Sequence, residues 1–451
     1  MDIRVNRTLV GPSRSRLLLL SPPQLMARLH SHVNGLRAFC ALVLIVLAHG
    51  AQSAEPMAAP FAPLGLDRLI ALSIQSHPSI SVARAQLGAA QSGVDAARAQ
   101  YYPTPSLQLL QDGKGDDATV LTVQQPLWTG GRIDAGWDAA RSRAHAAKLS
   151  IAEARRDLAL RVITVWAAWL QAHGRGEALK EGVRLLSGYT ESVNRRIEGG
   201  VSAVADRELV ASRLAQTQGD LAAAKAAEQV ALGRLTQLVG QQGVGQPLRS
   251  KDLAVPSLET STALPALEAL VAQAQARSTA LQRIEADIET AHHEVLQKRA
   301  VLWPNLSLRA QHQRSAANTT DANDNRVMLV LDYAPGAGLS AGAEIAATES
   351  RRQALREQLA AARSELMEGI LSDHGDYRAS TDRVQSLQHT LRATAAVLDS
   401  YDRLFIAGKR GWLDVINAAR ELIQVRTLLA DTQAQQAAAH ARLRLHLGEL
   451  F

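Results

Sequence analysis

Leucines recur at multiples of seven residues in two long segments of the chain. This spacing aligns apolar side chains on one stripe of an α-helix and is typical of coiled-coil packing. The intervening heptad position is polar in both segments, Glu228 in the first and Gln436 in the second. Each leucine of the second segment follows its counterpart by 208 residues (422 − 214 = 208): Leu214, Leu221 and Leu235 against Leu422, Leu429 and Leu443.

The same offset relates two glycine turns, which predicts a tandem duplication. Gly200 and Gly408 are each followed six residues later by an aspartate, Asp206 and Asp414 (408 − 200 = 208). We therefore divide the chain into a leader (1–54), a first repeat (55–240), a linker in the middle of the chain (241–263) and a second repeat (264–451). The linker is rich in Gly, Pro and Ser.

The sequence of each repeat predicts the same order of elements: a helix, two short strands, a very long helix and a further helix. A proline ends the first helix, because proline lacks the N–H that the helix needs. Alternation of Leu306, Leu308 and Ala310 with polar residues indicates a strand. The predicted helices are 66–101, 133–198, 203–239, 264–301, 340–407 and 413–447, and the strands are 106–111, 120–127, 305–312 and 327–333.

The helix lengths predict the wall of a cylinder. At 1.5 Å per residue the long helices span about 100 Å and the short ones about 50 Å. Two short helices placed end to end therefore match one long helix. Four glycines interrupt the long helices and are predicted to mark bends: Gly174, Gly176, Gly182 and Gly375.

The strands require partners from other chains if they enter a membrane. Four strands are too few to close a barrel, and open sheet edges do not occur in lipid. Oligomerisation is then a physical requirement of the membrane interpretation. The alternative interpretation is a soluble coiled-coil protein with two hairpins.

The N-terminal region predicts an exported protein. An apolar run at 36–48 follows Arg28 and Arg37 and precedes small residues, a pattern typical of a signal peptide cleaved near 51–54. Cys40, the one cysteine of the chain, lies in this run. The mature protein would therefore contain neither a disulfide nor a cysteine-based metal site.

Composition and motifs exclude several function classes. The chain has 451 residues, 4% of them aromatic, and a formal net charge of +6. Its basic residues are scattered among acidic ones, without the clustered footprint of a nucleic-acid-binding protein. The sequence contains no phosphate-binding loop, dinucleotide fingerprint or nucleophile elbow. We therefore expect no enzyme activity, no cofactor, no resident metal and no nucleic-acid partner.

The segment Gln-Pro-Leu-Trp-Thr-Gly-Gly-Arg-Ile-Asp at 125–134 follows the second strand. Together with the two glycine–aspartate turns, it resembles the TolC-like family of outer-membrane efflux and secretion proteins, over essentially all of the mature chain. The resemblance implies a mainly α protein with a membrane β-barrel portion. It implies a homotrimer with a twelve-stranded barrel in outer-membrane lipid and a helical barrel across the periplasm. It also implies a periplasmic adaptor protein and an inner-membrane pump as partners.

The segment 408–420 looks most like the type I secretion branch of this family, with Trp-Leu-Asp-Val followed by Asn-Ala and Arg-Glu. That branch, to which exporters of adenylate cyclase-haemolysin belong, implies an inner-membrane ABC transporter and an exported polypeptide of the RTX type. A duct of a multidrug or metal RND pump is the first alternative. A periplasmic coiled-coil scaffold without a pore is the second.

The resemblance also implies site residues. Asp399, nine residues before Gly408, matches an acid that lines the pore constriction, where three copies would form a carboxylate ring that favours cations. Ala396 stands where the family has a second acid. The alternative is that Asp399 is an ordinary solvent-exposed acid on a helix.

A gating latch is implied at Thr190, Glu191 and Arg392, with Leu387 in place of the family's tyrosine. Glu191 and Arg392 would form a charge-assisted link between neighbouring helices. The turns at Gly200, Asp206, Gly408 and Asp414 match the places where adaptor hairpins dock. Ordinary turns between two helices are the alternative there.

Overall fold

The computed structural model describes residues 63–111, 117–240, 247–256, 264–315 and 323–450. All of these residues belong to one compact unit, Ala62–Phe451. The predicted signal peptide and Cys40 lie outside the described residues.

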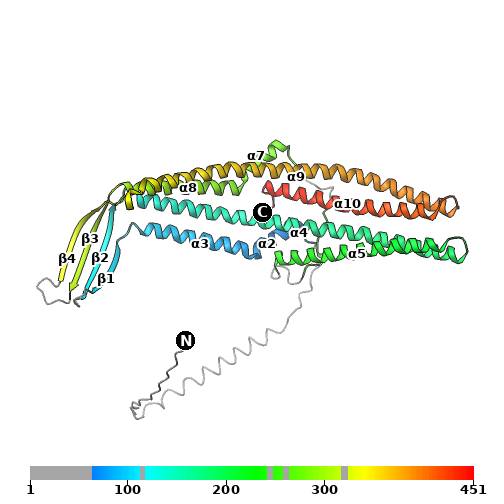
Figure 1. The fold of residues 1–451 in the computed structure, drawn as a ribbon, viewed down its shortest axis with the longest axis horizontal. Helices are drawn as coiled ribbons and strands as arrows, with labels where there is room; N and C mark the ends of the chain where they lie inside the picture. The colour runs from blue at the N-terminus through cyan, green and yellow to red at the C-terminus, as the bar shows by residue number, and fades with distance from the viewer. Residues whose placement is uncertain (1–62, 112–116, 241–246, 257–263, 316–322, 451) are drawn as a thin grey trace, which may run out of the picture. The chain divides into compact units, whose positions relative to one another are not determined.

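Both repeats contain the predicted order of elements, except that two helices stand in place of the first one (Figure 1). The first repeat consists of α2 (Leu66–Ser76), α3 (Pro78–Ala99), β1 (Thr104–Gln111), β2 (Asp117–Trp128), α4 (Arg132–Glu198) and α5 (Val204–Val239). The second consists of α7 (Leu267–Arg277), α8 (Thr279–Arg299), β3 (Asn305–Ser315), β4 (Asn323–Asp332), α9 (Ala341–Ile406) and α10 (Trp412–His446). A short 3₁₀ turn, Ser250–Asp252, lies in the described part of the linker.

The prediction of one first helix in each repeat is wrong, because each is two helices. In the first repeat His77 is extended at φ −74° and ψ 130°, since the residue before a proline avoids the helical conformation. Pro78 then begins α3. In the second repeat Ser278 is extended, and its side chain accepts a hydrogen bond from the Leu281 N–H at 3.4 Å, as helix N-caps do.

The helices form a layer in which short helices are stacked end to end beside long ones (Figure 1). α4 contacts α3 and α5 along one side, and α8 and α10 along the other. α9 packs against α8 and α10. The predicted combination of long continuous helices with short helices placed end to end is thereby confirmed.

The two long helices differ in how much of their surface is covered. α4 has eighteen buried residues among 67, whereas α9 has seven among 66. α4 lies between neighbours, but α9 has a neighbour on one side only. The layer therefore ends in two open edges within one chain, at α9 and at α3 with α5.

The glycines within the long helices do not end them. α4 continues through Gly174, Gly176 and Gly182, and α9 continues through Gly375. At Gly182 a Cβ atom would lie 2.9 Å from the Cδ1 atom of Ile423 on α10. The missing side chain therefore allows α4 and α10 to approach closely.

The four strands form one antiparallel sheet in the order β1-β2-β3-β4, so that β2 and β3 join the two repeats. The register places Leu107 opposite Leu121, and Leu308 opposite Leu329. Because side chains alternate between faces, one face is mostly apolar and exposed, with Leu329 66% exposed. The other face carries mainly polar residues, among them Gln108, Thr122, Gln124, Ser307, Arg309 and Gln311.

Within the described residues, every helix is too short or too polar to cross a membrane.

Candidate functional site

The two turns at the end of the helical layer have the same backbone geometry. Gly200 and Gly408 have φ values of +72° and +71°, which glycine adopts without steric cost. In each turn the N–H after the glycine donates to a carbonyl five residues earlier, at 2.8 and 2.9 Å. This pattern is the Schellman ending of a helix.

Asp206 and Asp414 occupy the third residue of the helices that follow these turns. Asp206 accepts a hydrogen bond from the Ala203 N–H at 3.3 Å, and Asp414 accepts one from the Arg410 guanidinium at 3.3 Å. A negative charge near a helix N-terminus is stabilising. The spacing of glycine and aspartate therefore has a local structural cause, and adaptor docking at these turns stays a prediction.

Asp399 lies on α9, near these turns, and its side chain is 66% exposed. It forms an ion pair with Arg403, one helical turn later. The carboxylate is therefore partly neutralised within its own subunit, while it remains available to solvent.

Sequence reasoning missed a tyrosine–carboxylate pair beside Asp399. The Tyr189 hydroxyl on α4 lies 2.9 Å from both carboxylate oxygens of Asp402 on α9. Burial and the Asp402 carboxylate raise the pKa of Tyr189, so its hydroxyl stays protonated and donates. Burial, together with the nearby Asp399 charge, raises the pKa of Asp402 against the effect of the Tyr189 hydrogen bond. The pair links the ends of the two long helices.

An aromatic cluster surrounds this link. Trp412, at the start of α10, is 5% exposed. Its ring contacts Tyr189 edge to face at a centroid distance of 5.3 Å, and Phe405 at 4.8 Å. The Arg196 guanidinium lies over the Phe405 ring at 4.3 Å. Side chains from α4, α9 and α10 thus hold this end of the layer together.

The residues of the predicted latch are not brought together in one chain. Thr190 donates to the Leu186 carbonyl within α4 at 3.0 Å. Glu191 and Arg392 are both exposed, and the ion pairs of the described residues do not include one between them. Leu387 is buried, with 9% of its surface exposed. A latch formed by Glu191 and Arg392 between subunits stays a prediction.

Contacts in the middle of the helical layer explain why one heptad position is polar in both repeats. Glu228 on α5 contacts His173 on α4 at 2.9 Å, and Gln436 on α10 donates to the Thr381 hydroxyl on α9 at 2.9 Å. These pairs are related by the repeat offset (381 − 173 = 208; 436 − 228 = 208). The two copies keep a polar contact between helices at the same place with different chemistry.

Glu228 also accepts a hydrogen bond from Ser250 in the linker. The Ser250 hydroxyl oxygen in turn accepts one from the Trp169 indole N–H at 2.9 Å. The polar position in the first repeat thereby fixes the described part of the linker to α4 and α5.

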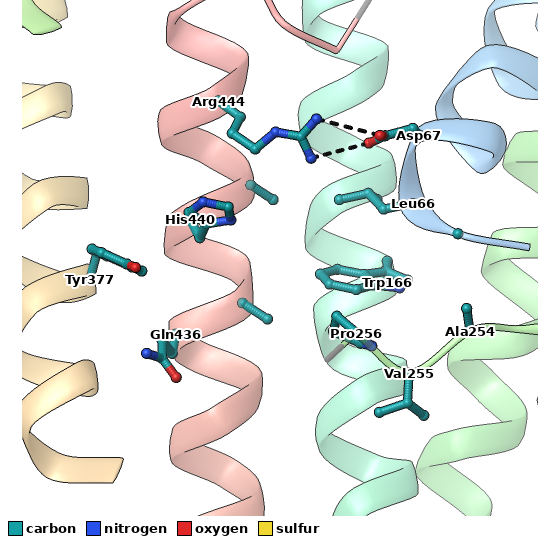
Figure 2. A pocket seen from close by; sticks show the side chains of 13 residues that line it. Leu66, Asp67, Trp166, Ala254, Val255, Pro256, Tyr377, Gln436, His440 and Arg444 are labelled. Atoms are coloured by element: carbon teal, nitrogen blue, oxygen red, sulfur yellow. Dashed lines mark hydrogen bonds and ion pairs between the residues drawn. The ribbon is translucent and has the colours of Figure 1, made fainter. Parts of the chain in front are cut away.

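An open cavity of about 420 Å³ lies nearby, between α2, α4, α9 and α10. Figure 2 shows its rim, where the Arg444 guanidinium pairs with the Asp67 carboxylate at 3.4 Å. Trp166 and Leu66 lie on the same side as Asp67, and His440, Tyr377 and Gln436 lie across from them (Figure 2). In the part of the chain that the structure describes, this cavity and the remaining surface contain no group of three side chains suited to hold a metal ion.

The outer membrane efflux protein family model matches residues 69–241 and 270–449, one segment in each repeat. The cobalt-zinc-cadmium resistance protein CzcC of Cupriavidus metallidurans is 25% identical over 370 residues, which are 81% of this chain and 85% of that protein.

Solved structures of outer-membrane channels share the fold. The outer-membrane channel OprN superposes with a TM-score of 0.74 at 17% identity, covering 85% of this chain and 90% of that one. The open state of the Neisseria gonorrhoeae MtrE channel superposes with a TM-score of 0.70 at 16% identity, covering 85% of this chain and 89% of that one.

These matches confirm the predicted TolC-like resemblance, the fold class and the outer-membrane location. They also confirm that the protein is a transport channel and not an enzyme. Since the family model covers well over half of the chain, with one match in each repeat, the chain belongs to the outer membrane efflux protein family.

Proposed function

We propose that this chain forms the outer-membrane duct of an efflux pump whose cargo is divalent metal cations. The observation that carries the proposal is the similarity to a cobalt-zinc-cadmium resistance protein, which extends over 81% of the chain. An exposed carboxylate at Asp399 fits a duct for cations, since acidic rings favour cation passage.

The duct is a homotrimer, the arrangement implied by the family. Within one chain α9 and the α3–α5 side of the layer are open edges, and β1 and β4 are open edges of the sheet. Contact of one edge with the opposite edge of the next copy is heterologous, and such contacts form a ring when the rotation between copies closes. Ring closure also pairs the strand edges, as lipid requires.

The duct has no energy source of its own, so transport depends on an inner-membrane transporter joined through a periplasmic adaptor. The turns at Gly200 and Gly408 are the proposed docking places. Their shared backbone geometry presents two similar surfaces in each subunit. For a metal pump the transporter would be of the RND type.

Type I secretion is the second candidate function, favoured by the segment 408–420. In that case an ABC transporter would drive an unfolded polypeptide through the same duct. Lys409 and Arg410 make the turn of this segment basic, whereas its counterpart around Gly200 reads Gly-Gly-Val-Ser. The two turns thus differ in charge even though their backbones match.

Deletion of the gene distinguishes the two candidates. We expect the deletion strain to accumulate zinc, cobalt or cadmium, measured by mass spectrometry of washed cells, and to recover when the gene is restored. The culture medium is compared by proteomics in the same experiment. Unchanged metal content together with the loss of one large extracellular polypeptide would replace the metal proposal by secretion.

Charge changes around Asp399 are expected to change ion selectivity in opposite directions. Asp399→Ala removes the proposed carboxylate ring, so cation selectivity in planar bilayers should fall. Arg403→Gln removes the partner of the same carboxylate, so cation selectivity should rise. The measurement is the reversal potential in a salt gradient. If both variants keep the wild-type potential, Asp399 does not line the constriction.

A further inference from the structure

Three arginines line one cavity of about 140 Å³ near the middle of the helical layer. Arg155 and Arg156 come from α4, and Arg277 comes from the end of α7. Ser278 and Thr279, at the start of α8, and His446, at the end of α10, also line it. The cavity therefore lies where the spliced helices α8 and α10 meet beside α4.

None of these arginines has a carboxylate within ion-pair distance among the described residues. Arg277 donates to the Leu447 carbonyl at 2.7 Å, and Arg156 contacts the Nδ1 atom of His446 at 3.3 Å. Arg155 makes no hydrogen bond within the described chain, and its Nε atom is buried without a partner. A buried donor without an acceptor costs free energy. The unpaired Nε–H group of Arg155 therefore indicates that an acceptor is missing from this site.

The neighbouring histidine does not offset the positive charge. Arg156 can only donate, and it lies 3.3 Å from the Nδ1 atom of His446, so neither side chain brings a negative charge to the cavity. The Nε2 atom of His446 lies 3.2 Å from a carboxylate oxygen of Asp373. Asp373 also accepts from Arg442 at 2.5 Å. The Asp373 carboxylate is thus already paired with Arg442 and His446.

The start of α8 adds donors to the same cavity. Ser278 is the N-cap and Thr279 the first residue of this 21-residue helix. The first N–H groups of a helix lack partners within the helix, and its N-terminus carries a partial positive charge. Guanidinium groups and helix N-termini both bind oxyanions in proteins.

We propose that this cavity binds a small tetrahedral oxyanion of the phosphate or sulfate class. Arg155 supplies a guanidinium that has no partner in the described part of the chain. Arg156 and the start of α8 line the same cavity, and Arg277 is at its exposed rim. A single water needs roughly 10–15 Å³ on this volume scale, so the cavity has room for the anion and several waters. The bound anion would connect α4, α8 and α10.

The site does not depend on what the duct exports. It lies between α4 and α9, away from the outer side of α9 and from α3 and α5, where neighbouring subunits are proposed to pack. It therefore stays accessible in the assembled channel.

The test is equilibrium dialysis of the purified trimer in detergent with radioactive inorganic phosphate, at constant ionic strength set by chloride. We expect one saturable site per subunit, from which sulfate displaces phosphate. Arg155→Gln should weaken binding by roughly tenfold or more, because it removes charge-assisted hydrogen bonds. Arg161→Gln is the matched control, an exposed arginine on the same helix without an ion pair in the described residues.

Melting curves without phosphate separate binding from folding. Since Arg155 has no partner among the described residues, Arg155→Gln should melt at or above the wild-type temperature. Absence of saturable binding in the wild-type trimer would overturn the proposal. Equal binding by the Arg155→Gln and Arg161→Gln variants would overturn it as well.

Discussion

Leu329→Arg is expected to abolish assembly of the protein in the outer membrane. Leu329 lies on the apolar face of the sheet, opposite Leu308, and is 66% exposed within one chain. An arginine that faces lipid near the centre of the bilayer costs about 2–4 kcal/mol. A trimer contains this residue three times, so the cost is tripled. The measurement is the amount of protein in the outer-membrane fraction after density-gradient separation.

The control for this variant is Thr122→Arg on the opposite face of the same sheet. Thr122 pairs with Ser106 and Gln311, both polar, so an arginine there faces other polar side chains. We expect normal assembly of this variant. Equal loss of both variants would show that either face rejects charge, and that the apolar face is not the one in contact with lipid.

Trp412→Ala is expected to loosen the end of the helical layer that carries the two glycine turns. Trp412 is 5% exposed and joins Tyr189 to Phe405. Truncation of a buried tryptophan to alanine costs about 3–5 kcal/mol. We expect faster trypsin cleavage after Lys409 and Arg410, the basic residues of the adjacent turn, and a lower melting temperature. Both are measured on the trimer in detergent.

Trp412→Phe separates packing from polar effects. The buried indole N–H of Trp412 has no partner in the segments that the structure describes, so its removal loses no hydrogen bond there. Phenylalanine keeps the ring contacts, and we expect near-wild-type cleavage. If Trp412→Phe were cleaved as fast as Trp412→Ala, ring packing would not be what holds the turns.

The duplicated fold was predictable because its signals are local and occur twice. Heptad leucines define the last helix of each repeat, and a glycine with positive φ ends each long helix. The breaks in the first helices were missed for two different reasons. Pro78 is visible in the sequence but stands at a position where proline can begin a helix. Ser278 carries no signal stronger than a capping hydroxyl.

The candidate site was less predictable because its contacts join distant parts of the chain. Tyr189 and Asp402 are 213 residues apart, and no spacing rule connects them. The family pattern directed attention to Leu387, on α9, whereas the tyrosine that reaches a carboxylate lies on α4. The polar positions Glu228 and Gln436 were visible as a repeated feature. Their partners His173 and Thr381 differ too much in chemistry to be matched from sequence.

The small number of buried residues in α9 has a thermodynamic consequence. Seven of its 66 residues are buried, so a large part of the surface of α9 is left open for contacts with a second copy. Folding of this helix and association of the subunits are then one equilibrium, governed by mass action. Its midpoint should shift with protein concentration. At high dilution, α9 should be the first long helix to exchange its amide hydrogens with solvent.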